Sequence, residues 1–112
     1  MFNSSLPEPD LLKALLEPLL EDFQYWFKRS RLLLETEEIH FLGAQRQGEL
    51  LLRVQQAQQE VSATQMLIQA TDGQVGVDTA ILMPWHQLVT ECWQVAIRFR
   101  LDSSPPSGED GN

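Results

Sequence analysis

Two short stretches hold the residue types that bind metals or attack substrates. Glu37 and His40 stand three positions apart, the spacing with which di-iron bundles place two ligands on one helix face. Such a site needs a second Glu-x-x-His pair, but Met83 stands three positions before the other histidine, His86. Closed zinc sites need four nitrogen or sulfur ligands, and the chain holds two His and one Cys. We read Glu37 to His40 as surface charge near a loop, and expect no metal and no cofactor.

Cys92 and His86 are the residue types of a thiolate nucleophile and its base. On one helix, however, their separation places them on faces about 120° apart and more than one turn away from each other. Cys92 lies on an apolar stripe beside Trp93, where a thiol usually behaves as an inert small hydrophobe. The sequence has no glycine-rich phosphate loop and no serine elbow. We therefore expect a protein that is not an enzyme.

Basic and aromatic residues alternate in two clusters, which favours binding over catalysis. The clusters are Tyr25, Trp26, Phe27, Lys28, Arg29 and Arg31, and Arg98, Phe99 and Arg100. Such a mixture can bind single-stranded nucleic acid. The chain nevertheless has 16 acidic and 8 basic residues and a net charge of −8, which disfavours phosphate binding and predicts no nucleic-acid partner. The commoner reading is a solvated face on which Lys and Arg stems cover apolar surface. If the clusters are functional, we favour docking on an acidic protein.

The string Met83-Pro84-Trp85-His86 is the most unusual local sequence. Pro84 predicts a helix bend, and an exposed Trp85 would be a typical interface hot spot. The competing reading is that Trp85 and Trp93 fill the core, because large aromatic side chains are mostly buried. The candidate partner-binding residues are Tyr25, Trp26, Phe27, Arg29, Arg31, Pro84, Trp85, Arg98 and Arg100.

Three stretches with helical periodicity must position these side chains. The first runs from about Asp10 to Glu35. Pro18 inside it predicts a kink, or a short first helix followed by a second, and the apolar pattern resumes in phase afterwards, which favours the kink. Its predicted stripe is Leu12, Leu16, Leu19, Phe23, Trp26, Ser30 and Leu33. Thr36 is a candidate cap for a short helical piece, residues 37–42.

The second helix is the central one, running from Gln45 or Glu49 to Ala70 and stopped by Asp72-Gly73. Its stripe is Leu50, Val54, Ala57, Val61, Thr64 and Ile68. The third helix runs from Asp78 to about Arg100 and bends or begins afresh near Pro84. Its stripe is Ile81, Trp85, Leu88, Cys92, Val95 or Ala96, and Phe99.

Three long helices with short connections predict an all-α protein, an antiparallel three-helix bundle. We expect a flexible N-terminus (1–6), a single helical domain (7–101) and a disordered acidic tail (102–112). No stretch approaches the 18 or so apolar residues of a transmembrane helix, and Met1 to Leu6 does not resemble a secretory signal. A lone Cys92 fits a reducing compartment, so the expected location is cytoplasmic.

The helices carry more apolar surface than one bundle can bury. Leucines at positions 32–34 and 50–52 cover most of the circumference of their helices. We therefore expect an interaction protein that binds a second copy or another protein. The alternative is a binder of a pigment or lipid tail, which requires a cavity lined by Phe23, Trp85, Leu88 and Trp93.

Three strings, LLEPLLEDFQYWFKRSRLLLE, QQEVSATQM and LMPWHQLVTECWQVAIRFR, are similar to segments of a small cyanobacterial family of uncharacterised proteins. The likeness covers residues 7–100. It brings no activity and no catalytic residue to transfer. It implies a protein of an oxygenic phototroph, in the cytoplasm or peripherally at the thylakoid surface, with a partner in photosynthetic assembly or regulation.

Overall fold

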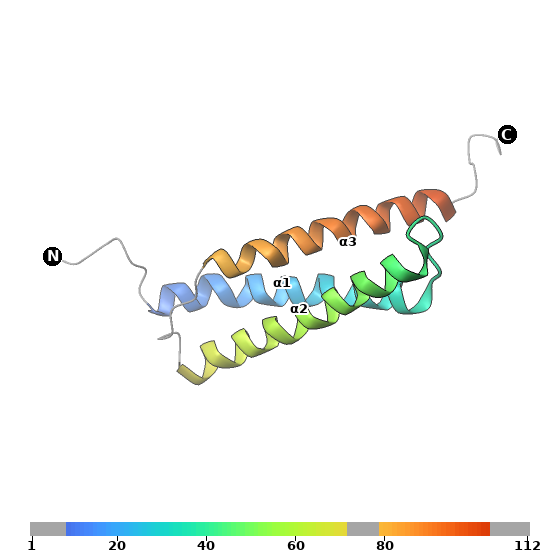
Figure 1. Ribbon diagram of the computed structural model, residues 1–112. Coiled ribbons are helices and arrows are strands. Elements are labelled where there is room, and N and C mark those ends of the chain that lie inside the picture. Colours follow the sequence, from blue (N-terminus) through green and yellow to red (C-terminus); the bar gives the residue numbers. More distant parts are fainter. Residues whose placement is uncertain (1–8, 72–78, 104–112) are drawn as a thin grey trace.

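The computed structural model describes residues 9–71 and 79–103, which form an all-α bundle without a strand (Figure 1). Its elements are α1 (Pro9–Thr36), α2 (Gly43–Thr71), the 3₁₀ turn η1 (Thr79–Ile81) and α3 (Leu82–Ser103). The three α-helices run alternately up and down, as the sequence predicts. The predicted flexible N-terminus, the Asp72-Gly73 stop and residues 104–112 of the predicted tail lie outside the described residues. Asp102 and Ser103, which we assigned to the tail, belong to α3.

The buried face of α1 is shifted from the predicted stripe. The buried side chains step by three, four or seven residues: Leu16, Leu20, Phe23, Phe27 and Leu34. Leu16 and Phe23 are buried as predicted, whereas the predicted members Leu19, Trp26 and Leu33 lie one position away, on the shoulder of this face. The prediction was wrong at these three positions because α1 is apolar over most of its circumference, so its sequence alone permits either neighbour to be buried.

Pro18 lies inside α1, which continues through it as one helix. Proline removes the hydrogen bond to the carbonyl of Ala14, four residues earlier. Both residues are exposed, so water can satisfy that carbonyl. The predicted continuation of the helix past Pro18 is confirmed.

The buried stripe of α2 follows the prediction closely. Leu50, Val54, Ala57, Val61 and Ile68 are buried, and Thr64 is half-buried. Residues 50–68 contain neither Gly nor Pro, and beyond the leucines at 50–52 the regularly spaced apolar residues lie on one side, which leaves a single phase for packing.

The third helix begins at Leu82 after η1, so Pro84 lies in its first turn. Proline is tolerated there because its missing N–H would have no partner within the helix. Of the two predicted arrangements, the helix start near Pro84 is confirmed. The short helix predicted at residues 37–42 is wrong: these residues form a turn, which ends at Gly43 with a positive φ of 79°. Thr36 is the last residue of α1, not a cap of a following helix.

One core joins the helices, and α1 and α2 contribute equally many buried side chains to it. Phe23 stacks on Phe27 with ring centroids 6.0 Å apart and meets Trp85 of α3 edge-on at 5.6 Å. α1 packs extensively against α2 and less extensively against α3, whereas α2 and α3 approach each other least. Two polar contacts connect α2 and α3: Arg53 pairs with Glu91 at 2.8 Å, and the Trp85 indole N–H donates to Glu60 at 2.9 Å.

Candidate functional site

An open groove of about 510 Å³ lies between α1 and α3, and we call it the α1–α3 groove. α1 contributes Trp26, Arg29, Ser30 and Leu33, and α3 contributes Cys92, Trp93, Ala96, Phe99, Arg100 and Ser103. A second recess of about 550 Å³ adjoins it along α1 and shares Arg29 and Leu33. This Tyr25 recess is completed by Tyr25, Lys28, Leu32, Thr36 and Glu37. The two hollows therefore lie on either side of Arg29 and Leu33.

Three aromatic side chains form a row across the groove. The ring centroids of Tyr25 and Trp26 are 5.1 Å apart, those of Trp26 and Trp93 are 6.1 Å apart, and both pairs meet edge-to-face. Such pairs contribute roughly 0.5–1.5 kcal/mol beyond their buried area. Tyr25 and Trp93 remain 52% and 54% exposed, so half of their surface is available to a partner.

The positions of the two indoles follow from helix geometry. Trp26 directly precedes the buried Phe27, and Trp93 directly follows the buried Cys92. One position corresponds to about 100° of rotation around a helix, so each indole stands on the shoulder of its core face. Because the shoulders of α1 and α3 are adjacent, the indoles meet above the core, not within it.

Arg29 is held against this row. Its guanidinium lies 5.5 Å from the ring centroid of Tyr25 and 5.9 Å from that of Trp26, and it donates to the Tyr25 hydroxyl at 2.7 Å. Cation–π contacts of this kind contribute about 0.5–1 kcal/mol at exposed sites. Among residues 9–71 and 79–103, no carboxylate lies within ion-pair distance of Arg29 or of Lys28. Arg29 lines both the groove and the Tyr25 recess, Lys28 lines only the recess, and neither is neutralised by a carboxylate of the described residues.

Cys92 lies at the floor of the groove and is 4% exposed. Burial raises the pKa of the Cys92 thiol, and a hydrogen bond with Ser30 opposes this only in part. The thiolate, which is the reactive form, is thereby disfavoured. Cys92 acts as a small apolar residue of the floor.

The structure brings four of the nine predicted contact residues to this surface: Tyr25, Trp26, Arg29 and Arg100. The expectation that Phe27 and Trp85 are surface residues is wrong, since they are 0% and 2% exposed. Each occupies the core stripe of its helix, and the Trp85 indole N–H is satisfied by Glu60. The core reading of Trp85 therefore holds.

The remaining three residues lie outside the groove. Arg31 is directed at α2 and donates to the Gln58 amide oxygen at 3.1 Å. Arg98 stacks on Phe41 at 4.2 Å and pairs with Asp102 at 3.9 Å. Pro84 is exposed in the first turn of α3.

Sequence reasoning missed Trp93 as a groove residue. The sequence position of Trp93 could have indicated its exposure, because it follows Cys92 directly and so lies off the buried stripe that Trp85 and Cys92 share. The cavity expected for a pigment or lipid is also not formed as predicted. Phe23, Trp85 and Leu88 pack within the core, while Trp93 is half exposed.

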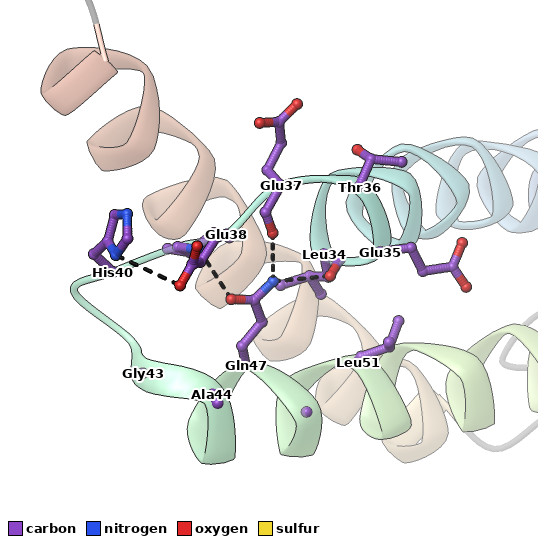
Figure 2. Close-up of a pocket in the computed structure, with 12 residues that line it drawn as sticks. Leu34, Glu35, Thr36, Glu37, Glu38, His40, Gly43, Ala44, Gln47 and Leu51 are labelled. Atoms are coloured by element: carbon purple, nitrogen blue, oxygen red, sulfur yellow. Dashed lines mark hydrogen bonds and ion pairs between the residues drawn. The ribbon is translucent and has the colours of Figure 1, made fainter.

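Another hollow, of about 530 Å³, lies at the turn between α1 and α2 (Figure 2). Gln47 spans it: its amide N–H groups donate to the carbonyls of Leu34 at 2.8 Å and Glu37 at 2.7 Å. Its amide oxygen accepts from the backbone N–H of Ile39 at 3.0 Å. The side chain thus satisfies carbonyls that the end of α1 leaves unpaired. The amide group of Gln47 is therefore engaged in holding the turn.

The predicted Glu37 to His40 segment lies in this turn, with an exposed ion pair of 3.8 Å between His40 and Glu38. Over residues 9–71 and 79–103, no group of three or more His, Cys, Asp or Glu side chains is placed to hold a metal ion. Within the same ranges, no helix combines the length and apolar character that a membrane crossing requires.

Comparison with known proteins identifies a family. The sequence model of a family described as "Protein of unknown function (DUF2605)" matches residues 6–101, which is most of the chain and includes α1, α2 and all of α3 except its last two residues. No curated protein and no solved structure matches the chain significantly.

Proposed function

The chain belongs to the DUF2605 family, and from the α1–α3 groove we propose a non-enzymatic protein-interaction module that holds a partner segment there. The observation that carries the proposal is the row of Tyr25, Trp26 and Trp93. Singly exposed apolar residues are ordinary on a protein surface, but a contiguous apolar patch marks an interaction site. Here the exposed rings contact one another and line two adjoining hollows.

The composition of the groove supports the same function. Trp, Tyr and Arg are the residues most enriched among interface hot spots, and all three types meet here. The aromatic row is already ordered by its own contacts and by Arg29, so binding would require little further loss of side-chain freedom. The apolar floor provides the surface that a partner side chain would remove from water.

The partner remains to be found by experiment. The resemblance to a cyanobacterial family suggests a protein of an oxygenic phototroph, in the cytoplasm or at the thylakoid surface, that is being assembled or regulated. A second copy of the chain is the simplest alternative partner.

The test is affinity capture from the host with wild type and two variants. Trp93→Ala removes an indole from the groove, and Leu52→Ala removes an exposed apolar side chain of α2 that is 66% exposed and outside the groove. We expect wild type and Leu52→Ala to capture the same polypeptide in similar amounts. The amount captured by Trp93→Ala should be lower by about tenfold or more. Circular dichroism must show unchanged helix content in both variants. Equal capture by all three proteins would exclude the groove as the contact.

A small-ligand binder is the second candidate, because about 510 Å³ lies within the size range of ligand pockets. Native mass spectrometry of protein purified from its host separates the two. A bound small molecule that disappears with Trp93→Ala would favour the ligand, and a second polypeptide would favour the interaction module.

A further inference from the structure

The charge at the groove is opposite in sign to that of the whole chain. The net charge of the chain is −8. The charged side chains lining the groove and the Tyr25 recess are nevertheless three basic ones, Lys28, Arg29 and Arg100, and one acidic one, Glu37. Lys28 and Arg29 lack an ion-pair partner among the described residues, whereas the surface cations Arg53 and Arg98 each pair with a carboxylate. An acidic chain that leaves two adjacent cations unpaired beside its exposed aromatic row has a local surface suited to an acidic partner.

This charge argues against a second copy as the occupant. A two-fold contact centred on the groove applies the same patch to itself, so Arg29 of one copy would lie near the cations of the other. The patch holds three basic side chains and a single acidic one, and like charges opposite one another oppose association. Its charges are complementary to those of an acidic segment.

The shape of the groove favours a helix. It lies between two neighbouring helices that run in the same direction, where a further helix can pack at the usual spacing of about 8–10 Å and complete a four-helix arrangement. Along α3 the lined surface extends from Cys92 to Ser103, a length of roughly 16 Å at 1.5 Å per residue. That length matches about three turns, whose apolar residues at i, i+3, i+4 and i+7 would face the groove.

We infer that the α1–α3 groove binds an acidic amphipathic helix of another protein. Apolar side chains of this helix pack between Trp26 and Trp93, and its carboxylates pair with Arg29, which lines both the groove and the Tyr25 recess. The inference rests on the proposed function and adds the chemistry of the partner.

The experiment selects binders from a displayed library of 20-residue helical peptides, randomised on one face, against the full chain. Selected peptides are then measured by fluorescence anisotropy against wild type, Trp93→Ala, Arg29→Glu and Arg46→Glu. Arg46 is the matched control, because it is an exposed cation of α2 outside both hollows, and its replacement changes the net charge equally. Circular dichroism checks that each variant is folded.

We expect the selected peptides to be acidic, with apolar residues spaced by three and four. Their affinity should fall about tenfold with Arg29→Glu and with Trp93→Ala, and less than about twofold with Arg46→Glu.

Selection of neutral or basic peptides, or an equal loss of affinity with Arg29→Glu and Arg46→Glu, would overturn the inference of an acidic helix. If the binding of these peptides still depended on Trp93, the groove would remain the binding site. Peptides indifferent to Trp93→Ala, or a selection without any binder, would overturn both proposals. Co-sedimentation with phosphatidylglycerol vesicles that is lost in Arg29→Glu would also overturn the inference, because the cations would then serve a lipid surface.

Discussion

Replacing each of the two tryptophans of α3 by alanine should lower the free energy of unfolding by very different amounts. Trp85 is 2% exposed, meets Phe23 edge-on and donates its indole N–H to Glu60, whereas Trp93 is 54% exposed. Large-to-small replacement of a buried aromatic costs about 3–5 kcal/mol. A domain of this size has a free energy of unfolding of about 5–15 kcal/mol, so Trp85→Ala should leave a marginally stable chain. Trp93→Ala loses mainly its contact with Trp26, about 1 kcal/mol.

Urea unfolding followed by far-UV circular dichroism measures both free energies without relying on tryptophan fluorescence. Trp85→Phe serves as a milder variant, because it retains a ring opposite Phe23 but loses the hydrogen bond to Glu60 and some volume. We expect it to cost about 1–2 kcal/mol. If Trp93→Ala destabilises the protein as much as Trp85→Ala, the assignment of one indole to the core and the other to the surface is refuted.

Three further predictions concern the turn, a salt bridge and the thiol. Gln47→Ala should lower the free energy of unfolding by about 1–3 kcal/mol in urea, because it removes three hydrogen bonds at the end of α1; an equal effect of Gln45→Ala, whose amide bonds only exposed Glu49, would contradict this. Arg53 lowers the pKa of Glu91 from 4.5, so their pair stabilises the fold above that pH, and its contribution is lost as the pH falls through the lower folded value. The two side chains are 52% and 47% exposed, so the free energy of unfolding of wild type should exceed that of Glu91→Gln by at most about 1 kcal/mol near pH 7. Below about pH 2 the two free energies should be equal. Cys92 should react with a thiol reagent at pH 8 at least about tenfold more slowly in the folded chain than in urea, and equal rates would show that the groove floor is open.

The sequence predicted the number of helices, their order and the core face of α2. The α2 face was predictable because Leu50, Val54, Ala57, Val61 and Ile68 keep a three-four spacing between polar neighbours. The core face of α1 was not, since both Leu19 and Leu20, and both Trp26 and Phe27, are apolar. Only packing against α2 and α3 decides which member of each pair is buried.

The candidate site was predictable in part. An aromatic and basic surface on α1 was expected, and Tyr25, Trp26 and Arg29 form it. Its α3 side was assigned to Trp85 instead of Trp93, although Trp85 shares the three-four stripe of Leu88 and Cys92 and Trp93 does not. The groove itself depends on how α1 and α3 are positioned in space, which no local pattern specifies.

The unequal seams of the bundle have a consequence for its motions. Because α1 packs more extensively against α2 than against α3, the backbone amides of α3 should exchange with deuterium before those of the α1–α2 pair. A partner bound in the groove contacts both α1 and α3, and so stabilises the less extensively packed α3 against α1. Occupancy would therefore register as slowed exchange along α3, even at amides that the partner never reaches.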